Sequence, residues 1–332
     1  MKKYLLPICA VLTLVLAAVI WPANPFDLTK TTITVPAGSS VPDIQRQLQE
    51  KKLLPGLTAF RVTIKLFGLG GMIKAGDYQF SSSDPLPLIV TKLALGDVVP
   101  QSEIAVAFPE GTSIYKMGES LKDKGFKDWY AFQALVHEGI TAKLREKYWS
   151  IFKYVPSESL EGYLFPDTYR VFPEADAAVL AERMVARFNE VIMPVWESSK
   201  QDTKMTLHET LTLASIIEKE AQKPEERPII SSVFYNRLKA RMPLAADPTV
   251  KYALERPSKI VYLDQLSVKS PYNTYKVRGL PPGPICNPGL DSFKAAIYPA
   301  KTDYFFFVAK KDGSHIFSKN WQEHQRARTK VQ

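Results

Sequence analysis

Hydrophobic residues change their spacing several times along the chain, and the first change predicts a membrane segment. Residues 4–21 form an apolar run without a charged side chain, preceded by two lysines. About 17 to 25 apolar residues span a bilayer as a helix, and flanking lysines favour the cytoplasmic side. We therefore predict a cytoplasmic stub at residues 1–3 and a transmembrane anchor at 4–21. A cleaved signal peptide is the alternative, although Trp21 and Pro22 stand where small residues would be expected.

Beyond this run, one strand–turn–helix pattern occurs twice. Residues 31–53 begin with five mostly β-branched residues, continue through a Pro-x-Gly turn, and end in a helical pattern with Val41, Ile44 and Leu48 on one face. Six of these positions recur in register at residues 104–126. We interpret the two segments as an internal repeat. The alternative is that both merely use common turn and capping chemistry.

The segment between the two units predicts a second strand and a further helix. Gly76–Phe80 has strand character, and a helical pattern with an apolar face runs to Leu95. Asp84 is the expected cap of that helix, with Pro85 at its first position. Residues 31–98 therefore predict a small α+β module.

The remainder of the chain, residues 99–332, predicts a larger mixed α+β domain. Its apolar pattern is mostly helical, and Asp312-Gly313 near the end lies between two short strand patterns, as in a hairpin. Helices are expected at 129–137, from 177 until Pro194 interrupts, at 207–222, at 228–242 and after a cap at Asp247, and strands at 304–309 and 315–318. The predicted fold class is α+β, with an N-terminal transmembrane helix preceding both parts.

Composition excludes several classes of protein. Hydrophobic residues make up 45% of the chain and charged residues 23%, which is ordinary for a globular protein. The formal charge of +9 suits an acidic polymer or an anionic membrane surface. The chain has no zinc-ligand spacing and no phosphate-binding glycine loop, so we expect no nucleic acid partner, no metal and no cofactor. Two cysteines, Cys9 and Cys286, exclude a disulfide scaffold.

The strongest chemical signal lies at the end of the helical pattern at 207–222. The positions from 211 to 217 are almost all apolar, and Glu218 follows them directly. A carboxyl group at the edge of a buried helix loses solvation, which favours its protonated form. That form is what a general acid for a glycosidic oxygen needs. The alternative is that Glu218 emerges at the helix end and pairs with a lysine or arginine.

Two further segments have the composition of a carbohydrate cleft. Residues 159–172 combine aromatic side chains with the acids Glu161 and Asp167. The loop at 270–289 contains five prolines and three glycines and presents polar and aromatic side chains. Its candidate substrate contacts are Tyr272, Asn273 and Tyr275. In both segments the alternative is a loop whose aromatic residues only pack it in place.

These segments together resemble the endolytic murein transglycosylase family, also called YceG-like. The resemblance is strongest from about residue 155 to 325, and six ordered blocks make it specific. The blocks are LEGYLFPDTY at 160–169, LASIIEKE at 213–220, SVFYNRL at 232–238, DPTVKYAL at 247–254, SPYNTYKVRGLPPGPICNPG at 270–289 and the FFFVAKKDGSHIFS hairpin with the following Glu323-His324.

The resemblance implies a single-pass protein of the cell inner membrane with a periplasmic catalytic domain. Residues 31–98 would be a LysM-like subdomain and residues 99–332 the YceG-like catalytic domain. The substrate would be nascent peptidoglycan strands, and penicillin-binding proteins that synthesise them would be partners. Glu218 matches the family's catalytic acid and base. Residues in the other blocks would contact substrate, the candidates being Tyr272, Asn273, Tyr275, Glu161, Asp167 and Asn236.

Two departures and two rival functions remain open. The run 241–246 lacks the amide side chain that the family usually has before Asp-Pro-Thr, and Cys286 stands where a small residue is common. One rival is a hydrolytic muramidase that uses a second carboxylate, from Glu161, Asp167 or Asp247. The other is a non-catalytic peptidoglycan-binding scaffold.

Overall fold

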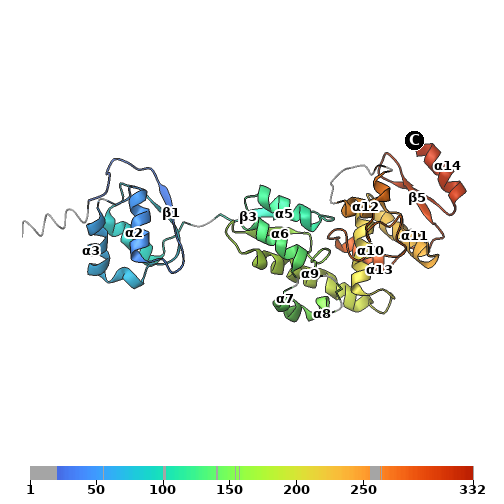
Figure 1. Ribbon diagram of the computed structural model, residues 1–332, viewed down its shortest axis with the longest axis horizontal. Coiled ribbons are helices and arrows are strands. Elements are labelled where there is room, and N and C mark those ends of the chain that lie inside the picture. The colour runs from blue at the N-terminus through green and yellow to red at the C-terminus, as the bar shows by residue number, and fades with distance from the viewer. Residues whose placement is uncertain are drawn as a thin grey trace, which may run out of the picture. The chain divides into compact units, whose positions relative to one another are not determined.

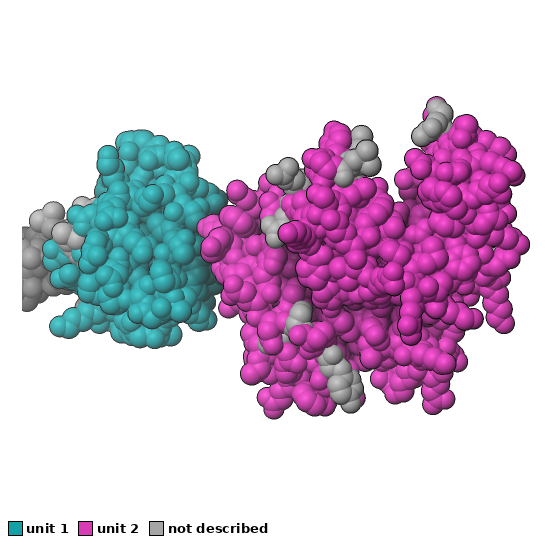
Figure 2. All heavy atoms as spheres, turned by 45° about the vertical axis from the view of Figure 1, so that its right-hand side comes forward, with its two compact units in different colours: residues 1–102 teal, residues 103–332 magenta. Residues whose placement is uncertain are grey.

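The computed structural model describes residues 21–54, 56–99, 102–139, 141–153, 155–156, 158–254, 262 and 264–331. The chain forms two compact units, residues 1–102 and 103–332 (Figures 1 and 2). The predicted anchor at 4–21 falls almost wholly outside the described residues. Within the described ranges, no helix is both long enough and apolar enough to span a bilayer. The predicted mixed α+β fold is confirmed.

Unit 1 is a two-stranded antiparallel sheet covered by helices. Its elements are β1 (Thr31–Val35), α2 (Val41–Glu50), α3 (Leu57–Phe67), η1 (Leu69–Gly71), β2 (Gly76–Phe80) and α4 (Leu86–Leu95). Alternate strand residues point inward, so Ile33 of β1 lies opposite Tyr78 of β2 in the core. Ile44 and Leu48 of α2 complete this core, as their spacing predicts.

The expected cap of α4 is wrong. Pro85 is the N-cap residue of α4, and no side chain caps that helix end. Asp84 instead accepts a hydrogen bond from the backbone N–H of Ser81 at 2.9 Å, which closes the turn after β2. An aspartate before a helix can either cap the helix or close the preceding turn, because its short side chain reaches backbone donors on both sides.

Unit 2 contains the rest of the chain around one continuous hydrophobic core. Its larger elements are β3 (Ile104–Ala107), α5 (Ile114–Asp123), α6 (Trp129–Glu138), α7 (Ala142–Lys147), α8 (Trp149–Phe152), β4 (Thr168–Val171), α9 (Ala177–Ser199), α10 (Leu207–Glu220), α11 (Arg227–Lys239), α12 (Asp247–Ala253), α13 (Leu290–Ile297), β5 (Phe306–Ala309), β6 (His315–Ser318) and α14 (Trp321–Val331). Figure 1 shows β3, α5 and α6 at one side of this unit and α11, β5 and α14 at the other.

Both predicted strand–turn–helix units are present, but their strands have different partners. β1 pairs with β2 inside unit 1, whereas β3 pairs with β4, more than sixty residues further along the chain. Each turn has a glycine with positive φ, Gly38 at 80° and Gly111 at 76°. The β3–β4 pairing brings the turn at Gly111 next to the segment at 160–169, because Phe108 N–H donates to the Asp167 carbonyl at 3.0 Å.

The predicted end of α9 at Pro194 is also wrong, because the helix continues through Pro194 to Ser199. Proline removes one intrahelical hydrogen bond and usually ends or kinks a helix. Here Ile192 and Met193 are buried next to it, so packing holds this part of the helix in place. Tertiary burial therefore outweighs the local preference.

Helix α10 is the buried centre of unit 2. It packs against α13 and α11, and every residue from Thr210 to Ile217 is buried. A capping box fixes its start: the Thr206 side chain accepts from Glu209 N–H, and the Glu209 carboxylate accepts from Thr206 N–H. The helix then runs without interruption to Glu220.

Replacing the cap should destabilise unit 2. We expect Thr206→Ala to lower the free energy of unfolding by about 1 kcal/mol, because the Glu209 N–H at the helix start loses its fixed acceptor. Urea denaturation followed by circular dichroism measures this loss. Thr329→Ala removes the same atoms from an exposed position of α14 and should change stability by less than about 0.5 kcal/mol. Equal effects of the two substitutions would show that the cap contributes nothing specific.

Candidate active site

Glu218 lies in the last turn of α10, with 7% of its side chain exposed. The backbone N–H of Gly289, at the start of α13, donates to its Oε2 at 3.0 Å. Arg227, the first residue of α11, places its Nη2 3.5 Å from Oε1. The carboxyl group is therefore buried and also paired with an arginine, and its role as a general acid stays a prediction. Each carboxyl oxygen faces a donor that suits a carboxylate.

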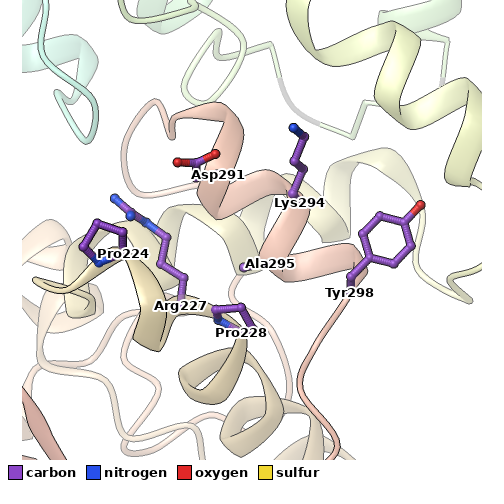
Figure 3. Close-up of a pocket in the computed structure, with 7 residues that line it drawn as sticks. All are labelled: Pro224, Arg227, Pro228, Asp291, Lys294, Ala295 and Tyr298. Atoms are coloured by element: carbon purple, nitrogen blue, oxygen red, sulfur yellow. The ribbon is translucent and has the colours of Figure 1, made fainter.

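Arg227 is itself held in place. Its side chain is 13% exposed, and its Nε donates to Ser292 Oγ on α13 at 3.0 Å. The guanidinium group also borders an open pocket of about 250 Å³. Figure 3 shows Arg227 and Asp291 at one side of this pocket and Tyr298 at the other. A hollow on the surface is therefore lined by the arginine that pairs with Glu218.

A second carboxyl group approaches this position, and the sequence analysis missed it. Glu110 stands in the turn between β3 and α5, and its carboxylate fills the space over the Cα atom of Gly289. Burial, and next the negative charge of Glu218, raise the pKa of Glu110, while Arg227 acts in the opposite direction. This burial is only partial, because the residue as a whole remains exposed to solvent. The site thus combines two carboxyl groups and one guanidinium.

The turn that carries Glu110 packs tightly against Glu218. A β-carbon at Gly111 would lie 3.3 Å from Cγ of Glu218, and the positive φ of Gly111 also disfavours any larger residue. Lys219 donates from Nζ to the Gly111 carbonyl at 3.2 Å, so α10 holds this turn from the neighbouring position.

Asn287 joins three segments of the site. Its Oδ1 accepts from the backbone N–H groups of Gly162 and Leu164, at 2.9 and 3.0 Å. Its Nδ2 donates to Glu161 and to the Thr112 carbonyl, each at 3.0 Å. Asn287 is completely buried, so these bonds replace all contact with water. The loop before α13, the segment at 160–169 and the turn after β3 are therefore fixed together.

Glu161 lies within this network, with only 3% of the residue exposed. The backbone N–H of Ile114, at the start of α5, donates to its carboxyl group at 3.2 Å. Burial raises the pKa of Glu161 to about 8. In this position Glu161 connects α5 to Asn287, and its predicted contact with substrate stays a prediction.

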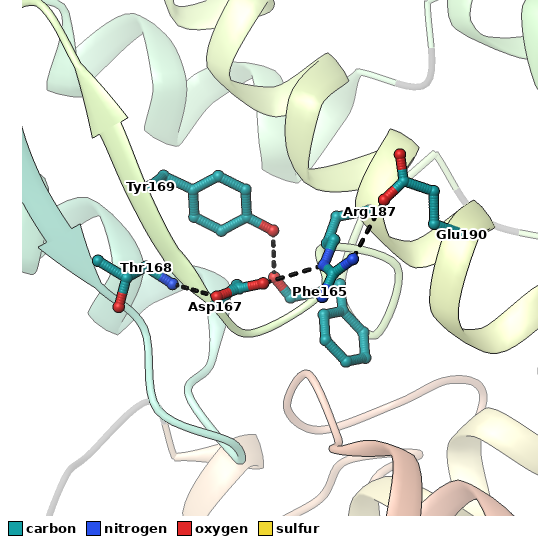
Figure 4. Close-up of polar contacts among 6 residues, drawn as sticks. All are labelled: Phe165, Asp167, Thr168, Tyr169, Arg187 and Glu190. Carbon is teal, nitrogen blue, oxygen red and sulfur yellow. Dashed lines mark hydrogen bonds and ion pairs between the residues drawn. The ribbon is translucent and has the colours of Figure 1, made fainter.

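Asp167 lies on the surface with its own partners (Figure 4). Its Oδ2 accepts from Arg187 Nε of α9 at 2.9 Å, and its Oδ1 accepts from Thr168 N–H at 2.7 Å. Figure 4 shows the carboxylate directed at Arg187, which also contacts Glu190. These contacts account for the conformation of Asp167, and its role at the substrate stays a prediction.

The candidate substrate contacts in the proline-rich loop at 270–289 are largely packed against other residues of the chain. Asn273 is buried and donates from its amide to the carbonyls of Leu266 and Val268, at 3.0 and 2.8 Å. The ring of Tyr272 lies 4.9 Å from that of Tyr252. The loop thus has a rigid, partly aromatic frame.

Tyr275 and Asp247 contact each other. The Tyr275 hydroxyl donates to Asp247 Oδ1 at 2.5 Å. Asp247 is therefore not the expected cap: Ala246 is the N-cap residue of α12, and no side chain caps this helix. Burial and the charge of Asp247 raise the pKa of Glu220 to about 7. Glu220 and Asp247 therefore form a second pair of neighbouring acidic residues.

The last candidate, Asn236 of α11, donates from its amide to the carbonyls of Thr302 and Tyr304, at 3.0 and 2.9 Å. It therefore holds the segment before β5 against α11. Cys286 is buried, with its Sγ 3.4 Å from the Ser215 carbonyl, and burial raises the pKa of its thiol. No group of three metal-ligating side chains occurs in the part of the chain that the structure describes.

The residues predicted from the sequence include Glu218 but not Glu110, Arg227 or Asn287, which the structure places in the same networks. One signal was available for Glu110, because the repeated turn has Pro-Ala-Gly at 36–38 and Pro-Glu-Gly at 109–111. The turn itself does not require a glutamate at this position, because the first copy of the turn has an alanine there. The glutamate therefore indicates a role outside the turn. Asn287 reaches Glu161 across 126 residues, and Arg227 begins the helix that follows Glu218, so their pairing depends on how the chain folds back and spacing could not reveal it.

Comparison with known proteins identifies the family. Residues 33–330 match the YceG-like family, and the chain belongs to it. A Bacillus subtilis (strain 168) protein named endolytic murein transglycosylase is 35% identical over 310 residues, covering 91% of this chain and 85% of that protein. A crystal structure of a YceG-like protein from Listeria monocytogenes aligns with a TM-score of 0.61 and 35% identity, covering 90% of this chain and 99% of that one.

A Streptococcus pneumoniae serotype 2 protein, also named endolytic murein transglycosylase, is 29% identical over 321 residues. The match covers 89% of this chain but only 57% of the pneumococcal protein. This chain therefore spans little more than half the length of that relative.

The buried carboxyl group of Glu161 should make stability depend on pH. Its pKa is about 8 in the folded chain against 4.5 for the solvated group, so folding favours the protonated form. That contribution is fully present below pH 4.5 and is lost as the pH rises through about 8. Glu161→Gln keeps the shape and removes the ionisation.

We therefore expect the free energy of unfolding of Glu161→Gln, relative to wild type, to rise between pH 5 and 9. Urea denaturation at several pH values measures this difference. Glu146→Gln, an exposed position of α7, is the matched control and should follow the wild-type dependence. A relative stability of Glu161→Gln that stays constant across this range would contradict the buried, protonated state.

Proposed function

We propose that this chain is an endolytic lytic transglycosylase that cleaves peptidoglycan strands, with Glu218 as acid and base. The observation that carries the proposal is the setting of Glu218: one buried carboxyl group whose two oxygens face the Gly289 N–H and the Arg227 guanidinium. Membership of the YceG-like family and the names of the relatives support it.

In the proposed reaction, protonated Glu218 donates its proton to the oxygen between N-acetylmuramic acid and N-acetylglucosamine. The bond from the muramyl C1 to this oxygen breaks. The Gly289 N–H and Arg227 then stabilise the carboxylate that remains on Glu218. This carboxylate takes the proton of the muramyl 6-hydroxyl, and the 6-oxygen bonds to C1 to close a 1,6-anhydro ring. One proton passes through Glu218, and no water is consumed.

The location and partners belong to the same proposal. The apolar run at 4–21 would anchor the chain in the inner membrane, with both units in the periplasm next to newly made strands. Trp21 at the end of this run and Phe26 shortly after it have exposed side chains that suit a membrane interface. Unit 1 would be the LysM-like module, and penicillin-binding proteins would supply the strands. The separate hydrophobic core of unit 1 supports its role as a module of its own.

A hydrolytic muramidase is the second candidate, because one observation favours it. Such enzymes use two carboxyl groups, and Glu110 lies beside Glu218. The previously considered second groups are engaged elsewhere, Glu161 with Ile114, Asp167 with Arg187 and Asp247 with Tyr275. A muramidase would add water and leave reducing ends, so its products differ from 1,6-anhydro ends.

Product analysis tests the proposal. We expect wild-type chain incubated with peptidoglycan to give internal cleavage with 1,6-anhydro-muramyl ends by mass spectrometry. Glu218→Gln should lower the rate by about 10²-fold or more, because the proton donor is lost. Glu225→Gln, an exposed glutamate on the segment after α10, should retain wild-type activity. Reducing ends would establish the muramidase, and equal activity of wild type and Glu218→Gln would remove Glu218 from the mechanism.

A further inference from the structure

Glu110 and Glu218 share one structural element, the residue Gly289. The N–H of Gly289 donates to Glu218 Oε2 at 3.0 Å, and the carboxylate of Glu110 covers the Cα atom of the same residue. A β-carbon at Gly289 would collide with this carboxylate, so the position leaves room for Glu110 only because it is a glycine. Next to Glu110, Gly111 packs on the side chain of Glu218. Glu110 is thus placed by two contacts with the Glu218 site.

The charged groups around Glu110 come from three helices. Glu218 on α10 and Asp291 on α13 both raise the pKa of Glu110, in addition to the larger effect of burial, while Arg227 on α11 lowers it. Lys219 holds the neighbouring Gly111 carbonyl at 3.2 Å. One arginine therefore faces two carboxyl groups that repel each other when both are ionised.

We propose that Glu110 is a positioning residue of the active site, whose carboxylate opposes ionisation of Glu218 so that Glu218 meets the substrate as an acid. The proposal rests on the proposed function and deepens it. No covalent step involves Glu110, and the proton donated to the substrate comes from Glu218.

This role would supply the influence toward the protonated form of Glu218 that its other two contacts do not provide. The Gly289 N–H and Arg227 both favour the ionised form of Glu218, which suits the second half of the reaction. The first half needs the protonated form, and a nearby negative charge favours it. Glu110 supplies that charge from an exposed position beside Gly289. The equivalent turn of unit 1, with Ala37, has no such carboxyl group.

The pH dependence of cleavage by the full-length chain tests the role. The alkaline limb reports the loss of the donating proton. We expect Glu110→Gln to move this limb to lower pH by about half a unit to one unit, because the opposing charge is removed while the partially solvated position screens its effect. At the acidic plateau the rate should stay within about threefold of wild type. Arg227→Gln should move the limb to higher pH.

A second variant displaces Glu110 without removing its charge. The backbone of Gly289 has φ −78°, which any residue adopts, so Gly289→Ala adds only a methyl group that pushes the Glu110 carboxylate away. It should shift the alkaline limb in the same direction as Glu110→Gln. In a Glu110→Ala background the same substitution should cause no further shift. Glu119→Gln, on the exposed face of α5, removes one charge elsewhere in the unit and should leave the profile unchanged.

Carboxyl ¹³C NMR titration provides a readout that does not need activity. The titration midpoint of Glu218 should fall in Glu110→Gln relative to wild type. An unchanged midpoint and an unchanged pH profile would overturn the proposal. Loss of cleavage by Glu110→Gln at every pH would also overturn it, because Glu110 would then act directly on the substrate. If wild type releases no anhydro ends, the proposed function fails, while the NMR midpoint still decides the relation between the two carboxyl groups.

Discussion

The buried side chain of Asn287 is the contact on which the geometry of unit 2 depends. One amide group satisfies two backbone donors of the segment at 160–169, the Thr112 carbonyl and the carboxyl group of Glu161. A buried amide with unsatisfied atoms is costly, so these partners have little freedom to separate. Since Gly289 lies two residues further on, the network also fixes the N–H group that faces Glu218. Three segments far apart in sequence are thereby held together, and two of them contact Glu218 through Gly111 and Gly289.

The active site places opposing charges within a small volume. Arg227 and the Gly289 N–H face the two oxygens of Glu218, and the carboxylate of Glu110 lies over the same Gly289. A group that gives and then takes a proton needs influences toward both its protonated and its ionised form, because each form is required in one half of the reaction. Glu161 lies close in the fold but differs in kind, since its ionisation is suppressed by burial and its contacts are structural.

Local features of the fold could be predicted from sequence, and long-range contacts could not. The strands at Thr31–Val35 and Gly76–Phe80 and the helix carrying Glu218 follow from spacing alone. Pro194 and the caps at Asp84 and Asp247 were misjudged, because each has more than one local solution and tertiary contacts select among them. No local pattern marked Arg227 or Asn287 as part of the site, because their roles depend on contacts with residues of other segments.

The repeated strand–turn–helix unit shows how one local design serves two purposes. In both copies a glycine with positive φ turns the chain and a serine begins the helix, so the backbone requirement is the same. The residue before that glycine is not restricted by the turn. In unit 1 it is Ala37, which has no polar group to offer. In unit 2 it is Glu110, and because β3 pairs with β4 and Asn287 binds the turn, this position faces Glu218. A position left open by local geometry thus acquires a chemical role only through the long-range pairing of its strand.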